Sequence, residues 1–347
     1  MVKQSVESLK SLVSRILVAA GASDENARLV SEHLVLANLS GVDTHGICHV
    51  EKYVKAIQDG DLLPAASPAV LEETPTTALV SGNWTFGHVA GRRAMQVAIE
   101  KASDQQVAVV GLVQTHHVGR LGHFTEMAAE AGMLSMVWAG GLDKETPTAF
   151  PFGGRRPLLH TNPIAMGVPG GEHPSMSYDF ATSATSGMKV ENAHRRGEQV
   201  PSGCIVDKHG SPTNDPKDFY DDGGHIAFGG HKGWAQMLAS EYLGRIFTGS
   251  DAYADPQRGG TGNRHQGVTM NVMKADMFQP WSHFQERATE LAQRTRDIPP
   301  AHGFDEVLVP GDPEKRTLEI RSRDGIPIED DVWDALVQVA ELVGVAM

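Results

Sequence analysis

The feature that most constrains this chain is a change in the period of its hydrophobic residues. Near both ends, apolar side chains recur every three or four positions, as at Leu9 and Leu12 and again at Val332 and Leu336, which is the spacing of an amphipathic helix. Between the ends lie short apolar runs such as residues 107–113, which predict strands buried on both faces. The sequence therefore predicts an α/β fold with a helical part built from both ends of the chain.

These patterns divide the chain into two predicted domains. Residues 1–72 and 312–347 are expected to form a helical domain, and residues 73–311 a central α/β domain around a mixed sheet. Residues 62–77 are rich in proline and small residues and are predicted to be a linker. Strands are predicted at residues 77–80, 107–113, 133–139, 164–168, 175–180 and 268–273.

Composition excludes several classes of partner. The 347 residues include 43 Asp and Glu against 30 Lys and Arg, which disfavours nucleic acid because phosphate binding needs concentrated cations. No apolar run approaches the roughly 20 residues of a membrane helix, and the first residues lack the apolar core of a signal peptide. With Cys48 and Cys204 as the only cysteines, a reducing cytoplasm is the expected location.

Several familiar chemistries lack their sequence signatures. No G-x-G-x-x-G follows a predicted strand, so an ordinary Rossmann dinucleotide site is not predicted. The chain also lacks the phosphate-binding loop G-x-x-x-x-G-K-[ST], the zinc motif H-E-x-x-H and the serine-hydrolase elbow G-x-S-x-G.

Histidines are the more informative residues, and five of them form two groups along the sequence. His45 and His49 are four positions apart, and His116, His117 and His123 follow the predicted strand 107–113. Loops at this end of a strand are common places for active-site residues. An imidazole there can act as a general acid or base near pH 7, although a histidine taken alone is more often a structural residue.

Charged residues near these loops suggest an anionic ligand. Arg120 could clamp a carboxylate or a phosphate. Asp179 closes a predicted strand and precedes small hydroxyl residues, and Lys232 opens a predicted helix, where its charge opposes the helix dipole. Residues 310–314 are predicted to form a turn after a short strand. Taken separately, each of these features also has an ordinary explanation as a cap, a turn or an exposed side chain.

Six segments give the chain a family resemblance when they are taken in order. They are residues 43–47 with Tyr53, 117–122, 161–163, 179–183 with Lys189, 231–233, and 310–311 with Glu314, Gly325 and Ile326. Together they resemble the type-2 malate/L-lactate dehydrogenase family, and the pair His116-His117 is most similar to its hydroxycarboxylate dehydrogenase B branch. The resemblance implies an NAD(P)-dependent 2-hydroxyacid oxidoreductase with a non-Rossmann cofactor domain, a small-molecule substrate and a homodimeric assembly.

The resemblance also implies roles for individual residues. His45 is expected to exchange the proton of the substrate hydroxyl, with His117 beside it as the alternative acid/base. The residues expected to contact the substrate are Thr44, His49, Tyr53 and Arg120. The residues expected to contact the cofactor are Gly119, Arg120, Leu121, Thr161, Asn162, Ser177, Tyr178, Asp179, Phe180, Ala181, Lys189, Lys232, Gly311, Asp312, Pro313 and Glu314. NAD is the expected cofactor, with NADP as the alternative.

This sequence departs from the family pattern at positions 49, 160 and 188, and its segment 140–148 is slightly longer than in the nearest branch. His49 stands where many members carry an arginine that binds the substrate carboxylate, and an imidazole can replace that arginine only when it is protonated. Met188 and His160 stand where glycines are usual. We therefore expect a changed substrate preference and a reshaped cofactor rim.

Two other functions compete with the dehydrogenase. A metal-dependent hydrolase or lyase could use His45, His49, His116, His117 and His123 as ligands, because their spacings include plausible metal-ligand spacings. A protein of the same fold could also bind the cofactor without turnover. The dehydrogenase hypothesis requires no metal ion.

Overall fold

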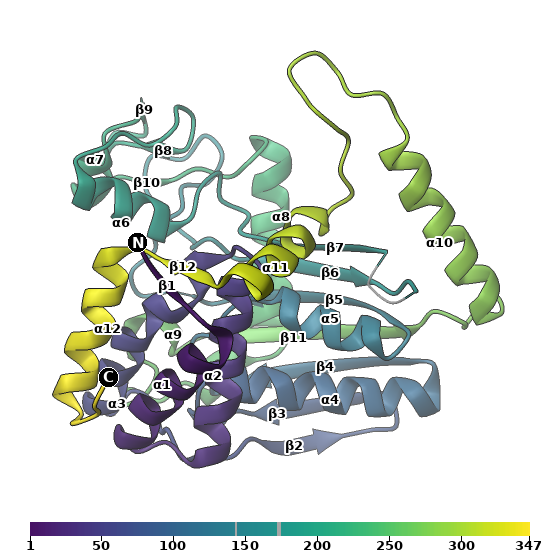
Figure 1. Ribbon diagram of the computed structural model, residues 1–347, viewed down its shortest axis with the longest axis horizontal. Coiled ribbons are helices and arrows are strands. Elements are labelled where there is room, and N and C mark those ends of the chain that lie inside the picture. Colours follow the sequence, from purple (N-terminus) through teal and green to yellow (C-terminus); the bar gives the residue numbers. More distant parts are fainter. Residues whose placement is uncertain (143, 172–174) are drawn as a thin grey trace.

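The computed structural model describes residues 1–142, 144–171 and 175–347, and a mixed sheet lies at its centre (Figure 1). The strands lie in the order β2-β3-β4-β11-β5-β6-β7. Their bounds are β2 Ala69–Glu73, β3 Thr77–Ser81, β4 Val107–Val113, β5 Met133–Gly140, β6 Ile164–Val168, β7 Met176–Phe180 and β11 Gly267–Lys274. Among the described strands of this sheet, only β3 and β4 pair in parallel, and helix α4 (Gly87–Gln105) makes the crossover between them.

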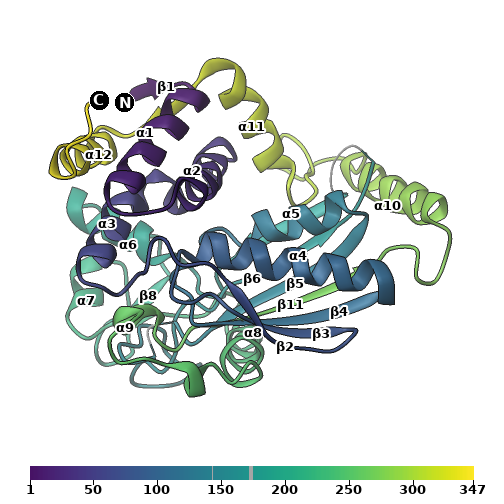
Figure 2. The same cartoon turned by 90° about the horizontal axis from the view of Figure 1, so that it is seen from below.

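The central strands are apolar because helices cover both faces of the sheet. Helices α4 and α5 (Gly122–Glu130) lie on one face, and α8 (His231–Glu241) lies on the other (Figure 2). Val110 on β4 and Met270 on β11 are cross-strand partners, and both are completely buried. The mixed α/β sheet and the strands predicted at residues 107–113 and 164–168 are therefore confirmed.

Both ends of the chain pack into one helical layer. The helices of this layer are α1 Val6–Ala19, α2 Asp24–Leu39, α3 Val50–Gln58, α11 Asp312–Asp324 and α12 Asp330–Leu342. Strand β1 (Val2–Gln4) pairs with β12 (Ile326–Ile328), and one hydrophobic cluster joins side chains from α1, α2, α3 and α12. The division into two domains stays a prediction, and β2 runs across the boundary proposed between residues 72 and 73.

The predicted linker is partly wrong, because residues 62–77 contain strand β2. This edge strand pairs antiparallel with β3, and most of its residues are exposed. Glu72 and Glu73 interrupt the alternation of apolar and polar residues that usually marks a strand. Charged side chains are common on the exposed edge of a sheet, so the strand forms without that alternation. Leu62, at the start of the segment, is buried in the helical layer.

A smaller lobe lies beside the helical layer. Its sheet has the order β10-β8-β9, and its elements are α6 Gly187–Arg196, α7 Pro216–Tyr220, β8 Ile205–Val206, β9 Pro212–Thr213 and β10 Gly224–His225. A separate small hydrophobic cluster includes Val190 and Ile205. Helix α9 is Gly260–Asn263. In the part of the chain that the structure describes, no helix is long and apolar enough to cross a bilayer.

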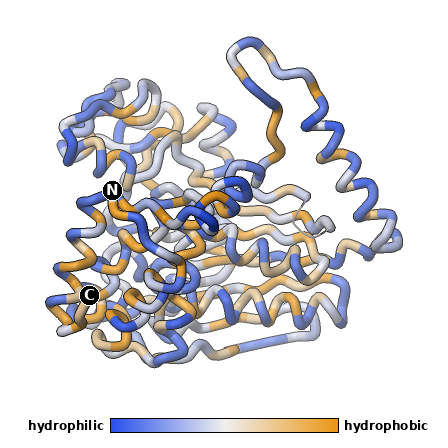
Figure 3. The backbone as a smooth tube through the Cα atoms, in the orientation of Figure 1, coloured by the Kyte–Doolittle hydropathy of each residue, from blue (hydrophilic) through white to orange (hydrophobic). Residues whose placement is uncertain are grey.

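Helix α10 (Trp281–Arg296) stands apart from the body of the molecule in both views (Figures 1 and 2). Most of it is hydrophilic, whereas apolar residues concentrate in the central strands and the terminal helices (Figure 3). Ala292 is its only buried residue. The amphipathic spacing of Phe284 and Leu291 predicts a helix, and the structure confirms that helix but leaves Leu291 largely exposed.

Candidate active site

The first histidine group lies on a loop held by the preceding helix. The loop consists of two short 3-10 turns, η1 (Asp43–His45) and η2 (Ile47–His49). Asn38 on α2 donates to an Asp43 carboxylate oxygen at 2.7 Å and accepts from the Ile47 backbone N–H at 2.9 Å. A Cβ atom at Gly46 would lie 2.1 Å from the Asn38 side-chain oxygen, so this approach requires glycine.

A long-range ion pair fixes the same loop from its other side. Arg321 on α11 binds both carboxylate oxygens of Asp43, at 2.7 and 3.0 Å. Two parallel bonds of this kind fix orientation as well as distance. The loop with His45 is therefore tied to the C-terminal part of the chain, which the sequence analysis did not anticipate.

The second histidine group lies on the segment after β4, packed tightly against the start of α4. A Cβ atom at Gly87 would lie 2.3 Å from the carbonyl oxygens of both His116 and His117. Gln266 also donates from its side-chain nitrogen to the His116 carbonyl at 2.9 Å. Close backbone packing thus positions this pair of histidines.

The structure brings the predicted catalytic and substrate residues together. The ring centroid of His117 lies 6.0 Å from that of His45 and 4.7 Å from that of His49. The Tyr53 hydroxyl lies 2.8 Å from His117 Nδ1, and the Thr44 hydroxyl lies 3.1 Å from His45 Nδ1. Each candidate acid/base thus has one ring nitrogen engaged by a hydroxyl group, which leaves Nε2 for a substrate.

Further histidines extend this group, and the sequence analysis missed two of them. His33 on α2 accepts from the Arg120 backbone N–H at 3.1 Å, and its ring lies 4.5 Å from His88 and 4.7 Å from His123. The Tyr53 hydroxyl is 3.4 Å from His88 Nε2. His33 and His88 are polar residues on helical faces that are otherwise buried, and this was the signal available in the sequence. We call the full set the histidine cluster; it consists of His33, His45, His49, His88, His116, His117 and His123.

Burial keeps the histidine cluster uncharged. Burial lowers the pKa of His49 to about 3, with a further contribution from the charge of His45. Burial alone lowers the pKa of His116 to about 4. The pKa of His117 lies well below its ordinary value because of burial and then of its neighbours His49 and His45. These imidazoles are therefore neutral at pH 7 and can accept protons, but they provide no permanent positive charge.

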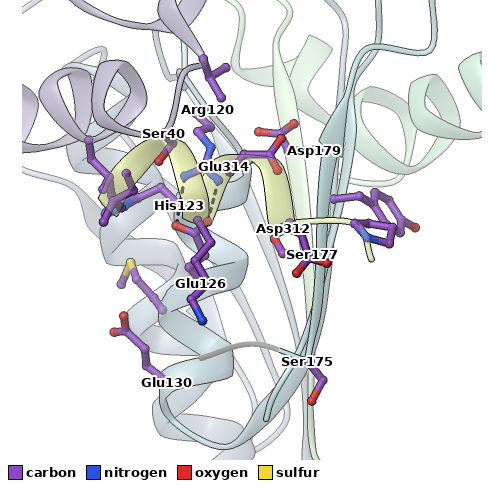
Figure 4. A pocket seen from close by; sticks show the side chains of 18 of the residues that line it. Ser40, Arg120, His123, Glu126, Glu130, Ser175, Ser177, Asp179, Asp312 and Glu314 are labelled. Atoms are coloured by element: carbon purple, nitrogen blue, oxygen red, sulfur yellow. Dashed lines mark hydrogen bonds and ion pairs between the residues drawn. The ribbon is translucent and has the colours of Figure 1, made fainter. Parts of the chain in front are cut away.

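A pocket of about 540 Å³ lies beside the cluster (Figure 4) and has the size of a cofactor site. Segments of α5, β7 and α11 face one another across it. The predicted cofactor residues that line the pocket are Arg120, Ser177, Tyr178, Asp179, Gly311, Asp312 and Glu314. Lining residues that were not predicted include Arg92, Glu126, Arg296 and Lys315.

Two residues connect the pocket with the cluster. Arg120 is 5% exposed, and Glu126 holds its guanidinium through two bonds of 3.0 and 2.6 Å. Asp179 accepts from the Gly122 backbone N–H at 2.7 Å, at the positive end of α5. Burial lowers the pKa of His45, while the charge of Asp179 raises it and that of Arg120 lowers it. His45 therefore lies within electrostatic reach of the pocket wall.

The residues of this pocket fit a dinucleotide. Carboxylates such as Glu314 can accept bonds from ribose hydroxyls, and arginines and a helix N-terminus suit phosphates. Gly311 precedes α11 with φ +103°, and a Cβ atom there would lie 3.4 Å from the backbone N and O of Ser177. The α11 N-terminus thus approaches β7 closely without a side chain between them.

Other predicted cofactor residues are described by the structure but do not line this pocket. Leu121 is buried in the core, and Gly119 packs against the rings of His33 and His88. Asn162 is completely buried and donates to the Met237 carbonyl at 3.2 Å. The rest of this group is Thr161, Phe180, Ala181, Lys189, Lys232 and Pro313. Their assignment to the cofactor stays a prediction.

The alternative metal site lacks a suitable set of ligands. Across residues 1–142, 144–171 and 175–347, no group of three or more His, Cys, Asp or Glu side chains could hold a metal ion. Several ring nitrogens of the cluster have other partners; for example, His49 Nε2 donates to the Thr44 carbonyl at 2.8 Å. The histidine spacings in the sequence therefore do not converge on one point in space.

Comparison with known proteins identifies the family. A family model described as malate/L-lactate dehydrogenase matches residues 4–337. The chain belongs to this family. The L-sulfolactate dehydrogenase of Methanocaldococcus jannaschii is 31% identical over 342 residues, which cover 97% of this chain and 96% of that protein. Hydroxycarboxylate dehydrogenase B of Escherichia coli is 30% identical over 343 residues, which cover 97% and 93%.

A solved structure agrees with this assignment. Malate dehydrogenase from Entamoeba histolytica matches with a TM-score of 0.92 and 25% identity, covering 100% of this chain and 99% of that chain. As a member of the malate/L-lactate dehydrogenase family, the chain is an oxidoreductase that uses a nicotinamide cofactor to interconvert a hydroxy acid and an oxo acid. The predicted family, fold class and dehydrogenase activity are confirmed.

Buried neutral histidines predict a loss of stability in acid. His225 is completely buried on β10, and burial, with a smaller contribution from His160, lowers its pKa to about 3. Such a histidine takes up a proton on unfolding once the pH falls below about 6.5. Stability is then full above pH 6.5 and falls toward pH 4, by about 1.4 kcal/mol per pH unit for each such histidine. Thermal unfolding between pH 7.5 and pH 4.5 measures this slope.

A substitution isolates one of these protons. His225→Leu should lower proton uptake on unfolding at pH 5 by about one proton, whereas the same change at the exposed His302 should leave the slope nearly unchanged. A melting temperature of the unsubstituted protein that stays constant from pH 7.5 to pH 5 would contradict neutral burial.

Proposed function

We propose that this protein is an NAD-dependent 2-hydroxyacid dehydrogenase in which a histidine of the cluster is the general acid/base. The observation that carries the proposal is the position of His45 and His117 beside a dinucleotide-sized pocket whose wall includes Arg120 and Asp179. When bound, the nicotinamide supplies or accepts the hydride. The protein must then move the hydroxyl proton and hold the substrate in place.

His45 is the first candidate for moving that proton. Its Nδ1 is engaged by the Thr44 hydroxyl at 3.1 Å, so its Nε2 is left for the substrate hydroxyl. Because burial lowers its pKa, His45 is neutral at pH 7 and can act as a base during oxidation. His117 is arranged in the same way, because the Tyr53 hydroxyl engages its Nδ1 and leaves its Nε2 for the substrate. We assign the proton transfer to His45, with His117 as the alternative.

Substitution separates these two histidines. His45→Ala should lower kcat by roughly 10²- to 10⁴-fold, because a positioned acid/base contributes about that much. NADH affinity should remain nearly intact. Steady-state kinetics of NADH oxidation by a panel of 2-oxo acids measures the first quantity, and fluorescence titration measures the second. An unaltered kcat in His45→Ala, together with a loss in His117→Ala, would transfer the role to His117.

The charge of the pocket lining favours NAD over NADP. Six carboxylates line the pocket against four Lys or Arg side chains, and two of these cations, Arg120 and Arg296, are bound to Glu126 and Asp312. A 2′-phosphate would add negative charge to an already negative surface. NAD, which lacks that phosphate, suits this lining better.

Cofactor titration tests both the pocket and this preference. NADH should bind at least tenfold more tightly than NADPH. Gly311→Val should also weaken NADH binding at least tenfold, because the new valine side chain would occupy space in the pocket wall. Gly344→Val is the matched control, since Gly344 also has a positive φ, +73°, but no atom lies within 4 Å of its Cβ position. Equal binding of both cofactors, or intact binding in Gly311→Val, would contradict the assignment.

We also propose that the enzyme is a cytoplasmic homodimer. Both cysteines are free thiols, as expected in a reducing compartment. The segment around α10 exposes large apolar side chains, among them Phe278 at 93%, Leu291 at 65% and Phe304 at 70% exposure. A protruding segment with exposed apolar side chains is suited to an interface between subunits.

Sedimentation equilibrium tests the assembly. The protein should sediment with the mass of two chains, and Leu291→Glu should shift it toward one chain because a charge in an apolar interface is costly. Leu342→Glu on α12 is the control, since Leu342 is equally exposed at 65% but lies outside the segment around α10. A single-chain mass for the unsubstituted protein would contradict the dimer.

A further inference from the structure

The substrate of this enzyme is an acid, so its carboxylate needs a positive partner. A carboxylate removed from water is costly unless a cation or several hydrogen bonds compensate it. The central rings of the histidine cluster do not supply this charge. His49 donates from Nε2 to the Thr44 carbonyl at 2.8 Å and is neutral at pH 7, because its pKa is about 3.

Arg120 is also poorly suited to be that partner. Its guanidinium is 5% exposed and already binds both carboxylate oxygens of Glu126. Turning toward a substrate would leave the Glu126 carboxylate without its partner in a half-buried position. Breaking a largely buried ion pair in this way is strongly unfavourable.

Lys52 is the candidate cation because it lies one helical turn after His49. It follows His49 by three positions on α3, a separation that places the two Cβ atoms about 5–6 Å apart on one helix face. The Lys52 side chain therefore starts from the helix face that carries His49, and its ammonium group ends against α6. The side chain is 51% exposed, so solvent and solutes can reach it.

The ammonium group of Lys52 connects α3 with α6. Lys52 Nζ lies 3.4 Å from Met188 Sδ and 3.4 Å from Glu191 Oε2, both on α6. Sulfur is a weak acceptor, and 3.4 Å is long for a charge-assisted bond. In the described part of the chain, Lys52 therefore has weak partners for an ammonium with three donors.

The charge of Lys52 also acts on the cluster. After burial and the neighbouring His45, Lys52 contributes to the lowered pKa of His49. It also opposes the effect of burial on the pKa of the Cys48 thiol. A positive charge that affects both neighbours is within electrostatic range of a carboxylate held beside His49.

We propose that Lys52 binds the carboxylate of a substrate held beside His49. This inference rests on the proposed 2-hydroxyacid activity and adds the residue that selects acids over their uncharged esters. Because its contacts with Met188 and Glu191 are weak, the ammonium can exchange them for the substrate carboxylate. Lys52 is then a specificity residue, and the proton transfer remains with the histidines.

The test compares Lys52→Met with Lys55→Met. Lys55 lies on the same helix, is 73% exposed and pairs with Asp59 at 2.7 Å, so it controls for loss of a surface charge. We expect Lys52→Met to raise KM for a 2-oxo acid by roughly ten- to hundredfold, the effect of losing a charge-assisted bond. KM for the methyl ester of the same acid and the Kd for NADH should not change. Lys52→Arg should recover most of the loss, and Lys55→Met should behave as the unsubstituted enzyme.

Two results would overturn the proposal. The first is an unchanged KM for the acid in Lys52→Met, and the second is an equal loss for acid and ester, which indicates a structural role. Calorimetric binding of oxamate to the NADH complex gives a readout that needs no turnover, and Lys52→Met should weaken it at least tenfold. Absence of turnover by the unsubstituted enzyme would count against the proposed activity, while oxamate binding would still decide the role of Lys52.

Discussion

The burial of neutral imidazole rings between the terminal helices and the α/β part is the constraint on which the active site depends. The rings come from both sides: His33 lies on α2, His88 lies on α4, and the pair His116-His117 follows β4. Ionised groups packed this closely away from water would repel one another at high cost. The contact between the two parts of the chain is therefore stable only while most of these rings are uncharged.

This neutrality also shapes the chemistry. A neutral imidazole can accept the proton of a substrate hydroxyl, but it cannot balance a permanent carboxylate charge. Charged groups accordingly lie at the edges of the cluster. Arg120 is balanced by Glu126, Asp43 is balanced by Arg321, and Lys52 reaches toward α6. Proton transfer and charge recognition are thus assigned to different residues.

Much of the fold could be predicted from the sequence, because continuous apolar runs at residues 107–113 and 164–168 leave few alternatives to buried strands. Strand β2 was missed because an exposed edge strand needs no apolar alternation. The position of α10 could not be predicted either, because its helical period says nothing about whether a face is packed or free.

The candidate site was predictable as a set of short motifs but not as a geometry. The loop motif around His45 and the segment with His117 were recognised, and the structure places their rings together. The partners that fix them are distant in the sequence: Arg321 pairs with Asp43 across 278 positions, and Asn263 approaches His116 across 147 positions. Such pairs leave no local pattern, because ion pairs and side-chain contacts depend on the folded path of the chain.

The central claim is that the histidine cluster and the adjoining pocket together perform hydride transfer to a 2-oxo acid. The most direct measurement uses NADH deuterated at the transferable position, a panel of 2-oxo acids and mass analysis of the products. The account predicts a 2-hydroxy acid that carries one deuterium at C2, formed equally well with and without a metal chelator. Products without deuterium, or activity abolished by the chelator, would contradict it.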